Sequence, residues 1–358
     1  MSGVEDETNK VYRLSRPKAY LICIGLFVVA FGFAYLFFRL TSHPSPSLST
    51  PSLRLNSTNL KYTNPLILSS SLGDKKQFTE YKPLENEVNQ FITQARAEGS
   101  LLDLGMYYRD LTDGSWTGVN EDDKFSPGSL QKVPLMIAYL KLSETDPAIL
   151  NEKLIDNLTS DVNSIQSIKP AHSIQYGQSA SVLDLIKLMI GFSDNNATDV
   201  LFNNIDHNNL KEVFSDLGVN FNENTTHSDY ISTKQFALFF RILYNSTYLD
   251  WYNSELSLSL MTQTDFKDGL AAGVPANIPV AHKFGESYDA SEAPPGGYPP
   301  EQLHDCGIIY YPKHPYILCV MTKGVVPVTK NSDNVSSLEK DIQTVSSMVY
   351  ADVQNRYH

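Results

Sequence analysis

The order of the predicted strands and helices limits the fold more than any other feature of this chain. After one helix, two strand-like segments follow each other and are joined by a turn at Asp113-Gly114. A long stretch with apolar residues at helical spacing comes next, and three more strands lie near the end. Strands are predicted at 104–110, 115–119, 280–286, 305–311 and 316–322, and helices at 84–97, 129–142, 182–192, 197–202, 209–217, 233–244 and 254–261.

Because strands come from both ends of this region, we expect an α+β fold, within the broad α/β class. One antiparallel sheet is formed by both ends of the domain and flanked by helices, with an all-helical subdomain inserted between them. The domain is expected to span residues 82–358. The chain is 42% hydrophobic, which is enough apolar material for a large core.

The N-terminal region predicts a membrane anchor. Residues 19–38 form an apolar run without a charge, and about 20 helical residues just cross a hydrocarbon core. Four basic residues precede the run, whereas only Arg39 follows closely, so residues 1–18 are expected in the cytoplasm. A cleaved signal peptide is the alternative, but Arg39-Leu40-Thr41-Ser42 fits a cleavage site poorly. The chain is therefore predicted to be a single-pass protein of the cell membrane, with its folded domain extracellular or periplasmic.

The remaining composition excludes some classes of function. Segment 39–81 is rich in Ser and Pro near its start and lacks a clear period, which predicts an extended linker.

The net charge is −12 without a visible basic patch, so nucleic acid is not an expected partner. Three cysteines are too few for a disulfide-based fold. Cys306 and Cys319 lie symmetrically about the predicted turn at 312–315, and either a cross-strand disulfide or two free thiols would fit.

The first short motif is Ser129-Leu130-Gln131-Lys132 at the start of a predicted helix. Positions i and i+3 share a helix face, so the Lys132 amine could remove the proton that keeps Ser129 a poor nucleophile. The helix N-terminus also offers N–H groups to a developing oxyanion. Pro134 predicts a tight or irregular first turn. Taken alone, the motif is equally consistent with an ordinary helix surface.

The second motif is Ser193-Asp194-Asn195, between two apolar helices. Its structural interpretation is helix capping, because Ser, Asp and Asn are preferred N-cap residues. Its functional interpretation gives Ser193 a role in passing a proton to a leaving group. Asn195 would then hold a substrate amide.

The third motif is Lys283-Phe284-Gly285, on a predicted strand. Lys283 could bind a substrate carboxylate and, as a nearby like charge, help to keep Lys132 neutral. Gly285 would let a substrate backbone pair along the strand edge, and the Glu286 N–H could complete an oxyanion hole. The alternative is an exposed lysine on an edge strand.

The order and spacing of the three motifs resemble the class A β-lactamases and the wider penicillin-recognising serine hydrolases. Residues 106–111 resemble the family's first hairpin, 125–134 its nucleophile helix and 306–309 the strand after its third motif, so the resemblance covers residues 82–358. It implies that Ser129 is the acylated nucleophile, Lys132 the base, Ser193 the proton shuttle, Asn195 a substrate ligand and Lys283 the anion site, with an oxyanion hole formed by the N–H groups of Ser129 and Glu286.

Two positions depart from the family pattern. Class A enzymes carry a loop glutamate that directs water at the acyl-enzyme, but the corresponding stretch, 218–233, is short and has no such motif. Glu223 is interpreted as a solvated loop residue. Phe284 replaces the usual Thr or Ser and is interpreted as a packing residue on the back of the strand.

The leading hypothesis is therefore a serine hydrolase that acts on β-lactams or related acyl-D-Ala-D-Ala peptides through a Ser129 acyl-enzyme. A D-alanyl-D-alanine carboxypeptidase or penicillin-binding protein with slow deacylation is one alternative, which the short loop favours. A non-catalytic binding domain of the cell envelope is another. The expected partner is a small-molecule β-lactam or a peptidoglycan stem peptide. No metal or cofactor is expected, and the protein is expected to be monomeric.

Overall fold

The computed structural model describes residues 61–63, 79–219, 231–288, 290–327 and 335–357. The predicted cytoplasmic tail (1–18), the predicted membrane segment (19–38), most of the predicted linker (39–81) and Glu223 lie outside these ranges. Of the helices in the described ranges, none combines the length and the hydropathy that a membrane crossing requires.

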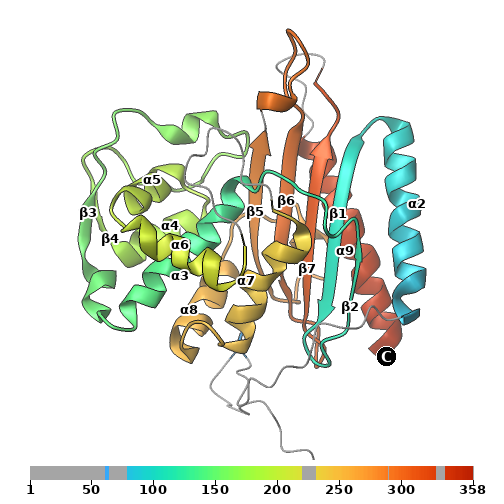
Figure 1. The fold of residues 1–358 in the computed structure, drawn as a ribbon, viewed down its shortest axis with the longest axis horizontal. Coiled ribbons are helices and arrows are strands. Elements are labelled where there is room, and N and C mark those ends of the chain that lie inside the picture. Colours follow the sequence, from blue (N-terminus) through green and yellow to red (C-terminus); the bar gives the residue numbers. More distant parts are fainter. Residues whose placement is uncertain (1–60, 64–78, 220–230, 289, 328–334, 358) are drawn as a thin grey trace, which may run out of the picture. The chain divides into compact units, whose positions relative to one another are not determined.

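A five-stranded antiparallel sheet runs through the domain in the order β2-β1-β7-β6-β5. Two strands from the start of the domain pair with three from its end, as predicted (Figure 1). The turn between the first two contains Gly114, whose φ of +79° suits glycine. The strands are β1 (Leu101–Asp110), β2 (Trp116–Val119), β5 (Val280–Tyr288), β6 (Glu301–Ile309) and β7 (Tyr316–Gly324).

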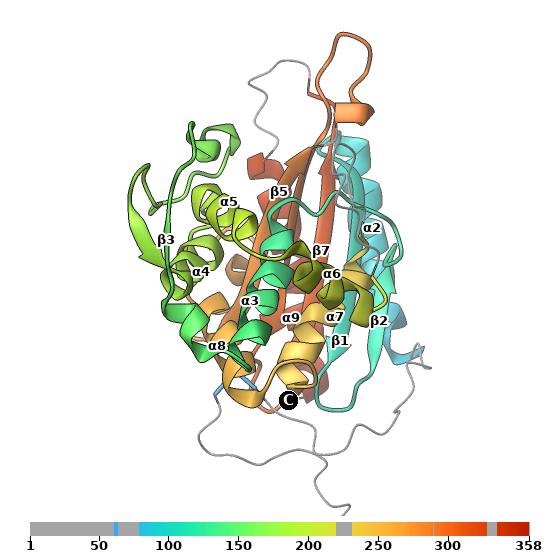
Figure 2. The ribbon, with the colours of Figure 1, turned by 60° about the vertical axis from the view of Figure 1, so that its left-hand side comes forward.

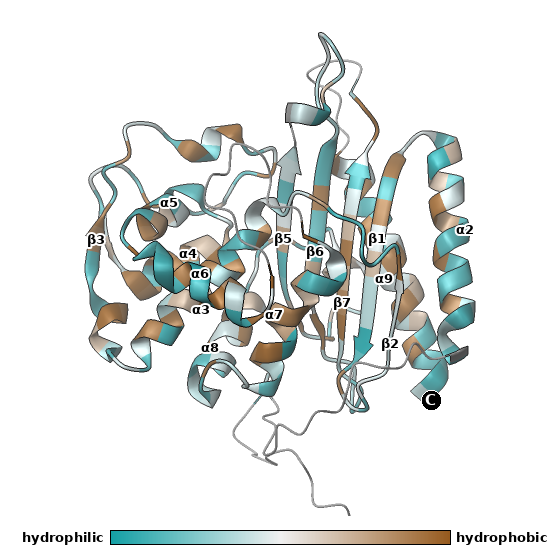
Figure 3. Cartoon of the chain, in the orientation of Figure 1, coloured by the Kyte–Doolittle hydropathy of each residue, from teal (hydrophilic) through white to brown (hydrophobic). Residues whose placement is uncertain are grey.

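One face of the sheet is covered by α2 (Lys82–Glu98) and α9 (Val335–Tyr357), which come from opposite ends of the domain. The sequence predicted most of α2 but missed α9. The signal was present, because apolar residues recur at helical spacing from Val335 to Val353 and are buried against the sheet. Figure 3 shows hydrophobic residues along the strands, as expected for a sheet covered on both faces.

The helical subdomain lies on the other face of the sheet (Figure 2). Its central helix, α3, is almost entirely buried. All the predicted helices of this region are present, and their ends lie within a few residues of those expected. The helices are α3 (Lys132–Ser143), α4 (Val182–Gly191), α5 (Asn195–Asn203), α6 (His207–Asp216), α7 (Thr233–Asn245) and α8 (Trp251–Met261). The sequence did not predict the short elements between α3 and α4, which are η3 (Pro147–Asn151), β3 (Lys153–Ile155), η4 (Val162–Ile165) and β4 (Ser179–Ser181).

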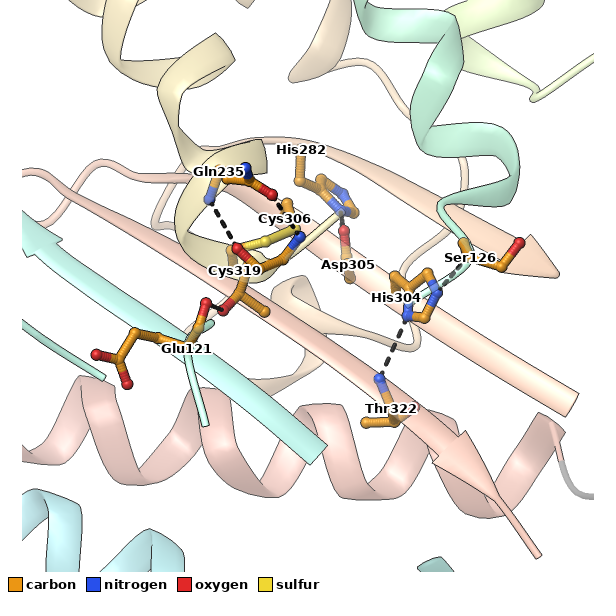
Figure 4. Close-up of a disulfide and its surroundings, with 11 residues drawn as sticks. Glu121, Ser126, Gln235, His282, His304, Asp305, Cys306, Cys319 and Thr322 are labelled. Carbon is orange, nitrogen blue, oxygen red and sulfur yellow. Dashed lines mark hydrogen bonds and ion pairs between the residues drawn. A yellow bond between two sulfur atoms is a disulfide. The ribbon is translucent and has the colours of Figure 1, made fainter. Parts of the chain in front are cut away.

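Cys306 and Cys319 form a disulfide that links β6 to β7. They are directly opposite in the strand register, with 4.0 Å between their Cα atoms, as the symmetry about the turn suggested. Both cysteines are fully buried. Figure 4 shows the bond between their sulfur atoms. The neighbouring His282 side chain is also buried, and its Nδ1 lies 2.9 Å from Oδ1 of Asp305. His282 is thus a core residue.

Candidate active site

Ser129 lies in a 3-10 turn, η2 (Gly128–Gln131), directly before α3. The irregular start that Pro134 predicted is therefore present, because the regular α-helix begins only at Lys132. Gly128 has a φ of +51°, and a Cβ there would lie 2.1 Å from the Glu286 carbonyl oxygen. No larger residue fits this position, so the turn packs directly on the edge strand β5.

Gly285 makes the same close approach possible from the strand side. A Cβ at this position would lie 2.6 Å from the Pro127 carbonyl oxygen and 2.9 Å from the Leu130 nitrogen. The motif alone predicted that Gly285 leaves room for a substrate backbone. In the structure, the space beside it is filled by the turn that carries Ser129.

The chain just before this turn is fixed at Ser126 by three residues of the sheet. The Ser126 N–H donates to Gln302 Oε1 (3.0 Å), its carbonyl accepts from His304 Nε2 (2.8 Å), and its hydroxyl lies 2.7 Å from Ser287 Oγ. The Thr322 N–H donates to His304 Nδ1 (3.3 Å), so this imidazole must be neutral with its proton on Nε2 (Figure 4). Burial lowers the pKa of His304 to about 4, which keeps it neutral. Local sequence patterns gave no sign of this support, because Ser126 and His304 are 178 positions apart.

Lys132 is 3% exposed, and its amine contacts the second motif. It donates to the Ser193 carbonyl (2.7 Å), Ser193 Oγ (3.0 Å) and Asn195 Oδ1 (2.7 Å). Burial lowers the pKa of Lys132 to about 7, although nearby carboxylates, including that of Asp194, oppose the shift. The amine can therefore lose a proton near neutral pH. Among the described residues, it makes no direct hydrogen bond to Ser129, although both residues line one cavity.

Lys283 comes from β5 and is fully buried. Its amine donates to Ser193 Oγ (3.0 Å) and to the Phe284 carbonyl (2.8 Å). Burial, and secondly the positive charge of Lys132, lower the pKa of Lys283. The Ser193 hydroxyl thus lies within 3.0 Å of both amines. Ser193 reaches this position with a φ of +54°, an unfavourable conformation for a serine that is typical of functional sites.

Asp194, in the middle of the second motif, has a structural role. It is the N-cap of α5, as the capping interpretation predicted, and its Oδ1 accepts from the Asn196 N–H (3.0 Å). The same carboxylate accepts from Asn163 Nδ2 (2.8 Å) and the Ile174 N–H (3.0 Å). Asn163 also accepts from the Asn195 N–H (2.7 Å) and so helps to orient that motif residue. The sequence offered no signal for Asn163.

The Glu286 N–H points away from the sheet. The Tyr310 N–H donates to the Pro279 carbonyl. Along an antiparallel strand only every second residue bonds to its neighbour, so the odd-numbered residues of β5 bond to β6. Glu286 is even-numbered, and its N–H therefore points away from β6. Because β5 is the edge strand, this N–H faces the cleft. The Glu286 carboxylate in turn accepts from the N–H groups of Ser167 (2.7 Å) and Ile168 (3.1 Å). These two bonds, called the Glu286 bridge below, join the sheet edge to the segment after η4.

A cavity of about 340 Å³ lies beside Ser129. The site residues Ser129, Lys132, Asn195 and Glu286 all contribute to its lining, together with apolar side chains of α3, α5 and α6. Ser193 and Lys283 are buried behind it, bonded to Lys132 either directly or through the Ser193 hydroxyl. The residues of the three motifs therefore converge on one place, where an amine that can lose its proton and a serine hydroxyl line the same cavity.

A sequence model of the Beta-lactamase enzyme family matches residues 83–353. The chain belongs to this β-lactamase family. No curated protein matches it in sequence. Among solved structures, a β-lactamase from Chitinophaga pinensis DSM 2588 is similar with a TM-score of 0.62 and 20% identity, over 76% of this chain and 100% of that one. PBP-A is similar with a TM-score of 0.60 and 21% identity, over 76% and 97% of the two chains. TLA-1, an extended-spectrum β-lactamase, has a TM-score of 0.61 and 18% identity, over 77% and 99%.

This member of the β-lactamase family has an aromatic side chain in the middle of its third motif. Phe284 is 1% exposed and packs against Phe266, with 4.3 Å between the ring centroids. It belongs to the core on the α2 and α9 side of the sheet, so the packing interpretation is confirmed. The Lys283 amine lies 4.0 Å from the centroid of the same ring. Phe284 thus puts a buried aromatic ring at the sequence position where the family pattern has Thr or Ser.

Proposed function

We propose that this protein is a serine hydrolase that forms an acyl-enzyme at Ser129 with β-lactams or related acyl-D-Ala-D-Ala peptides. The observation that carries the proposal is the buried Lys132 amine, whose pKa of about 7 makes it a usable base and which lines the same cavity as Ser129. A solved PBP-A variant, described as an acyl-enzyme complex with penicillin G, supports this substrate class.

In the proposed acylation, neutral Lys132 takes the Ser129 proton while the serine oxygen attacks the substrate carbonyl. The N–H groups of Ser129 and Glu286 stabilise the oxyanion that develops. Ser193 passes a proton to the leaving nitrogen, because its hydroxyl lies beside both lysine amines. Asn195 contributes to substrate binding through its amide, and Lys283 attracts the substrate carboxylate.

We further propose that deacylation is slow, as in a penicillin-binding peptidase. Hydrolysis of the acyl-enzyme needs a base that removes a proton from the water as it attacks the acyl carbonyl. Among the described residues that line the cavity, Glu286 is the one carboxylate, and both of its oxygens already accept backbone N–H groups in the Glu286 bridge. This favours a stable adduct over rapid turnover of a β-lactam.

We also propose that residues 19–38 anchor the domain in the cell membrane, with the domain outside. The support comes from the apolar run and from the basic residues before it. Such a location would suit both β-lactams and cell-wall peptides as substrates.

The test is to label the full-length protein with fluorescent penicillin and to locate the adduct by mass spectrometry. We expect one adduct, on Ser129, that persists for longer than a normal enzymatic turnover. Ser129→Ala should abolish it, with the fold checked by circular dichroism. Absence of an adduct on the wild type, or equal labelling of Ser129→Ala, would contradict the proposal and favour a non-catalytic binding domain.

A further inference from the structure

The cavity beside Ser129 extends into an apolar region that the acylation step itself does not use. This region is lined by Leu135 of α3, Phe202 of α5, and Leu210 and Phe214 of α6. Leu135, Leu210 and Phe214 are 3%, 4% and 6% exposed, so they form a fixed wall. We call these four residues the apolar wall.

One helix face connects the polar site to the apolar wall. Asn195, Thr198 and Phe202 all line the cavity and are spaced i, i+3 and i+7 along α5. The stripe therefore begins at the hydrogen-bond partner of Lys132 and ends at an aromatic ring. Seven residues at 1.5 Å per residue cover about 10 Å, which is the length of a medium acyl chain.

The opposite side of the site is polar. Ser193 and Lys283 lie there, and the Ser193 hydroxyl is 3.0 Å from the amines of both Lys132 and Lys283. The leaving group departs toward Ser193, because the Ser193 hydroxyl supplies its proton in the proposed mechanism. The acyl part of the substrate must then extend away from Ser193, where the cavity leads along α5 to the apolar wall.

We propose that the apolar wall is the acyl-binding subsite and that the preferred substrates carry an apolar acyl group, either alkanoyl or arylalkanoyl. This inference rests on the proposed acyl-enzyme at Ser129. The size of the cavity is suitable, because an apolar cavity of about 150 Å³ is enough to bind benzene. The whole cavity, with its polar part beside Ser129, measures about 340 Å³, so it would hold the reacting carbonyl together with a phenylacetyl group or a chain of medium length.

The subsite can be probed with p-nitrophenyl esters of increasing chain length, from acetate to decanoate. In each case Ser129 Oγ forms a bond to the ester carbonyl carbon, and Lys132 takes the serine proton. The bond to p-nitrophenolate breaks, and this leaving group departs with the electron pair. Water later releases the carboxylic acid and restores the serine. The nitrophenolate burst thus reports acylation directly, and no cofactor is needed.

We expect the second-order acylation rate to rise about fourfold for each added methylene until the cavity is full, a factor that converts to about 0.8 kcal/mol. Thr198 is half-buried and lies in the middle of the α5 stripe, so Thr198→Phe should fill the cavity. This variant should lower the ratio of the octanoate rate to the acetate rate at least tenfold. Phe202→Asn is a second variant at a partly exposed position, and it should lower the same ratio by making the end of the stripe polar. Glu212→Gln, on the exposed face of α6, is the control and should leave the ratio unchanged.

The outcomes separate this inference from the proposed function. A penicillin adduct on Ser129 together with equal rates for all esters, or with acetate as the best ester, would overturn the acyl subsite alone. An unchanged ratio in both folded pocket variants, Thr198→Phe and Phe202→Asn, would do the same. Absence of any adduct on Ser129, with either penicillin or esters, would instead contradict the proposed function.

Discussion

Gly285→Ala should slow the acylation of Ser129 without removing any group that takes part in the chemistry. The added Cβ would lie 2.6 Å from the Pro127 carbonyl oxygen and 2.9 Å from the Leu130 nitrogen. Both are backbone atoms that flank the nucleophile, so neither can rotate away. Restoring a contact of normal length requires the turn to move by about 0.6 Å. Since a misplacement of about 1 Å costs on the order of a hundredfold, we expect a loss of roughly tenfold to thirtyfold.

The assay measures the second-order rate constant for labelling by fluorescent penicillin. Samples are quenched at several reaction times and at several penicillin concentrations. Overpacking should also lower the stability by about 1–3 kcal/mol. The labelling is therefore done well below the melting temperature, which is measured by circular dichroism. Gly191→Ala is the matched control. Its Cβ would meet nothing closer than the Gln263 carbonyl oxygen at 3.9 Å, and alanine suits a helix better than glycine does.

A folded Gly285→Ala protein that labels at the wild-type rate would refute this reasoning. It would mean that the close packing of the turn on β5 does not position Ser129. Slow labelling of the Gly191→Ala protein would also count against this reasoning. The lower acylation rate would then be a general effect of replacing a glycine in this fold.

Three other perturbations have expected results. The acylation rate measured between pH 5 and pH 9 should fall about tenfold per unit below pH 7, because protonated Lys132 cannot accept the serine proton; a flat profile would contradict this. Glu286→Gln should move this acid limb to lower pH, because the Glu286 carboxylate helps to raise the pKa of Lys132; a limb at higher pH would be the wrong sign. Asn163→Ala should lower the unfolding free energy in urea by about 1–3 kcal/mol, because the Asn195 N–H and the Asp194 carboxylate each lose a buried partner. Equal urea midpoints would contradict that prediction.

Local patterns were enough to predict most of the fold. Turn residues and alternating apolar residues predicted all five strands of the main sheet, and helical spacing predicted the helices that surround α3. Pro134 also predicted the irregular turn at Ser129, because the effect of a missing N–H is local. The C-terminal helix α9 was not predicted, although its apolar residues recur at helical spacing in the same way.

The supports of the site could not be predicted in the same way. Ser126 and His304 are 178 positions apart, and Ser167 and Glu286 are 119 apart. Each contact depends on strand pairing and on the path of loops, which single-sequence patterns do not contain. The motif residues themselves could be grouped only through a family resemblance. A hydrogen-bonding side chain such as that of Asn163 has no local signature when its partners are distant.

The two buried lysine amines and the Ser193 hydroxyl form one hydrogen-bonded unit. The Ser193 carbonyl and Asn195 Oδ1 can only accept, so they bind two N–H groups of Lys132 in either protonation state. The Ser193 hydroxyl is different, because it can accept from one amine and donate to the other. When Lys132 is charged, it donates to this hydroxyl, which donates to neutral Lys283. When Lys132 has lost its proton, its lone pair can accept from this hydroxyl, which in turn accepts from an N–H of Lys283. Reversing one hydroxyl therefore frees Lys132 to act as a base without leaving a buried polar atom unpaired. This explains why a serine, held in an unfavourable backbone conformation, lies between the two amines.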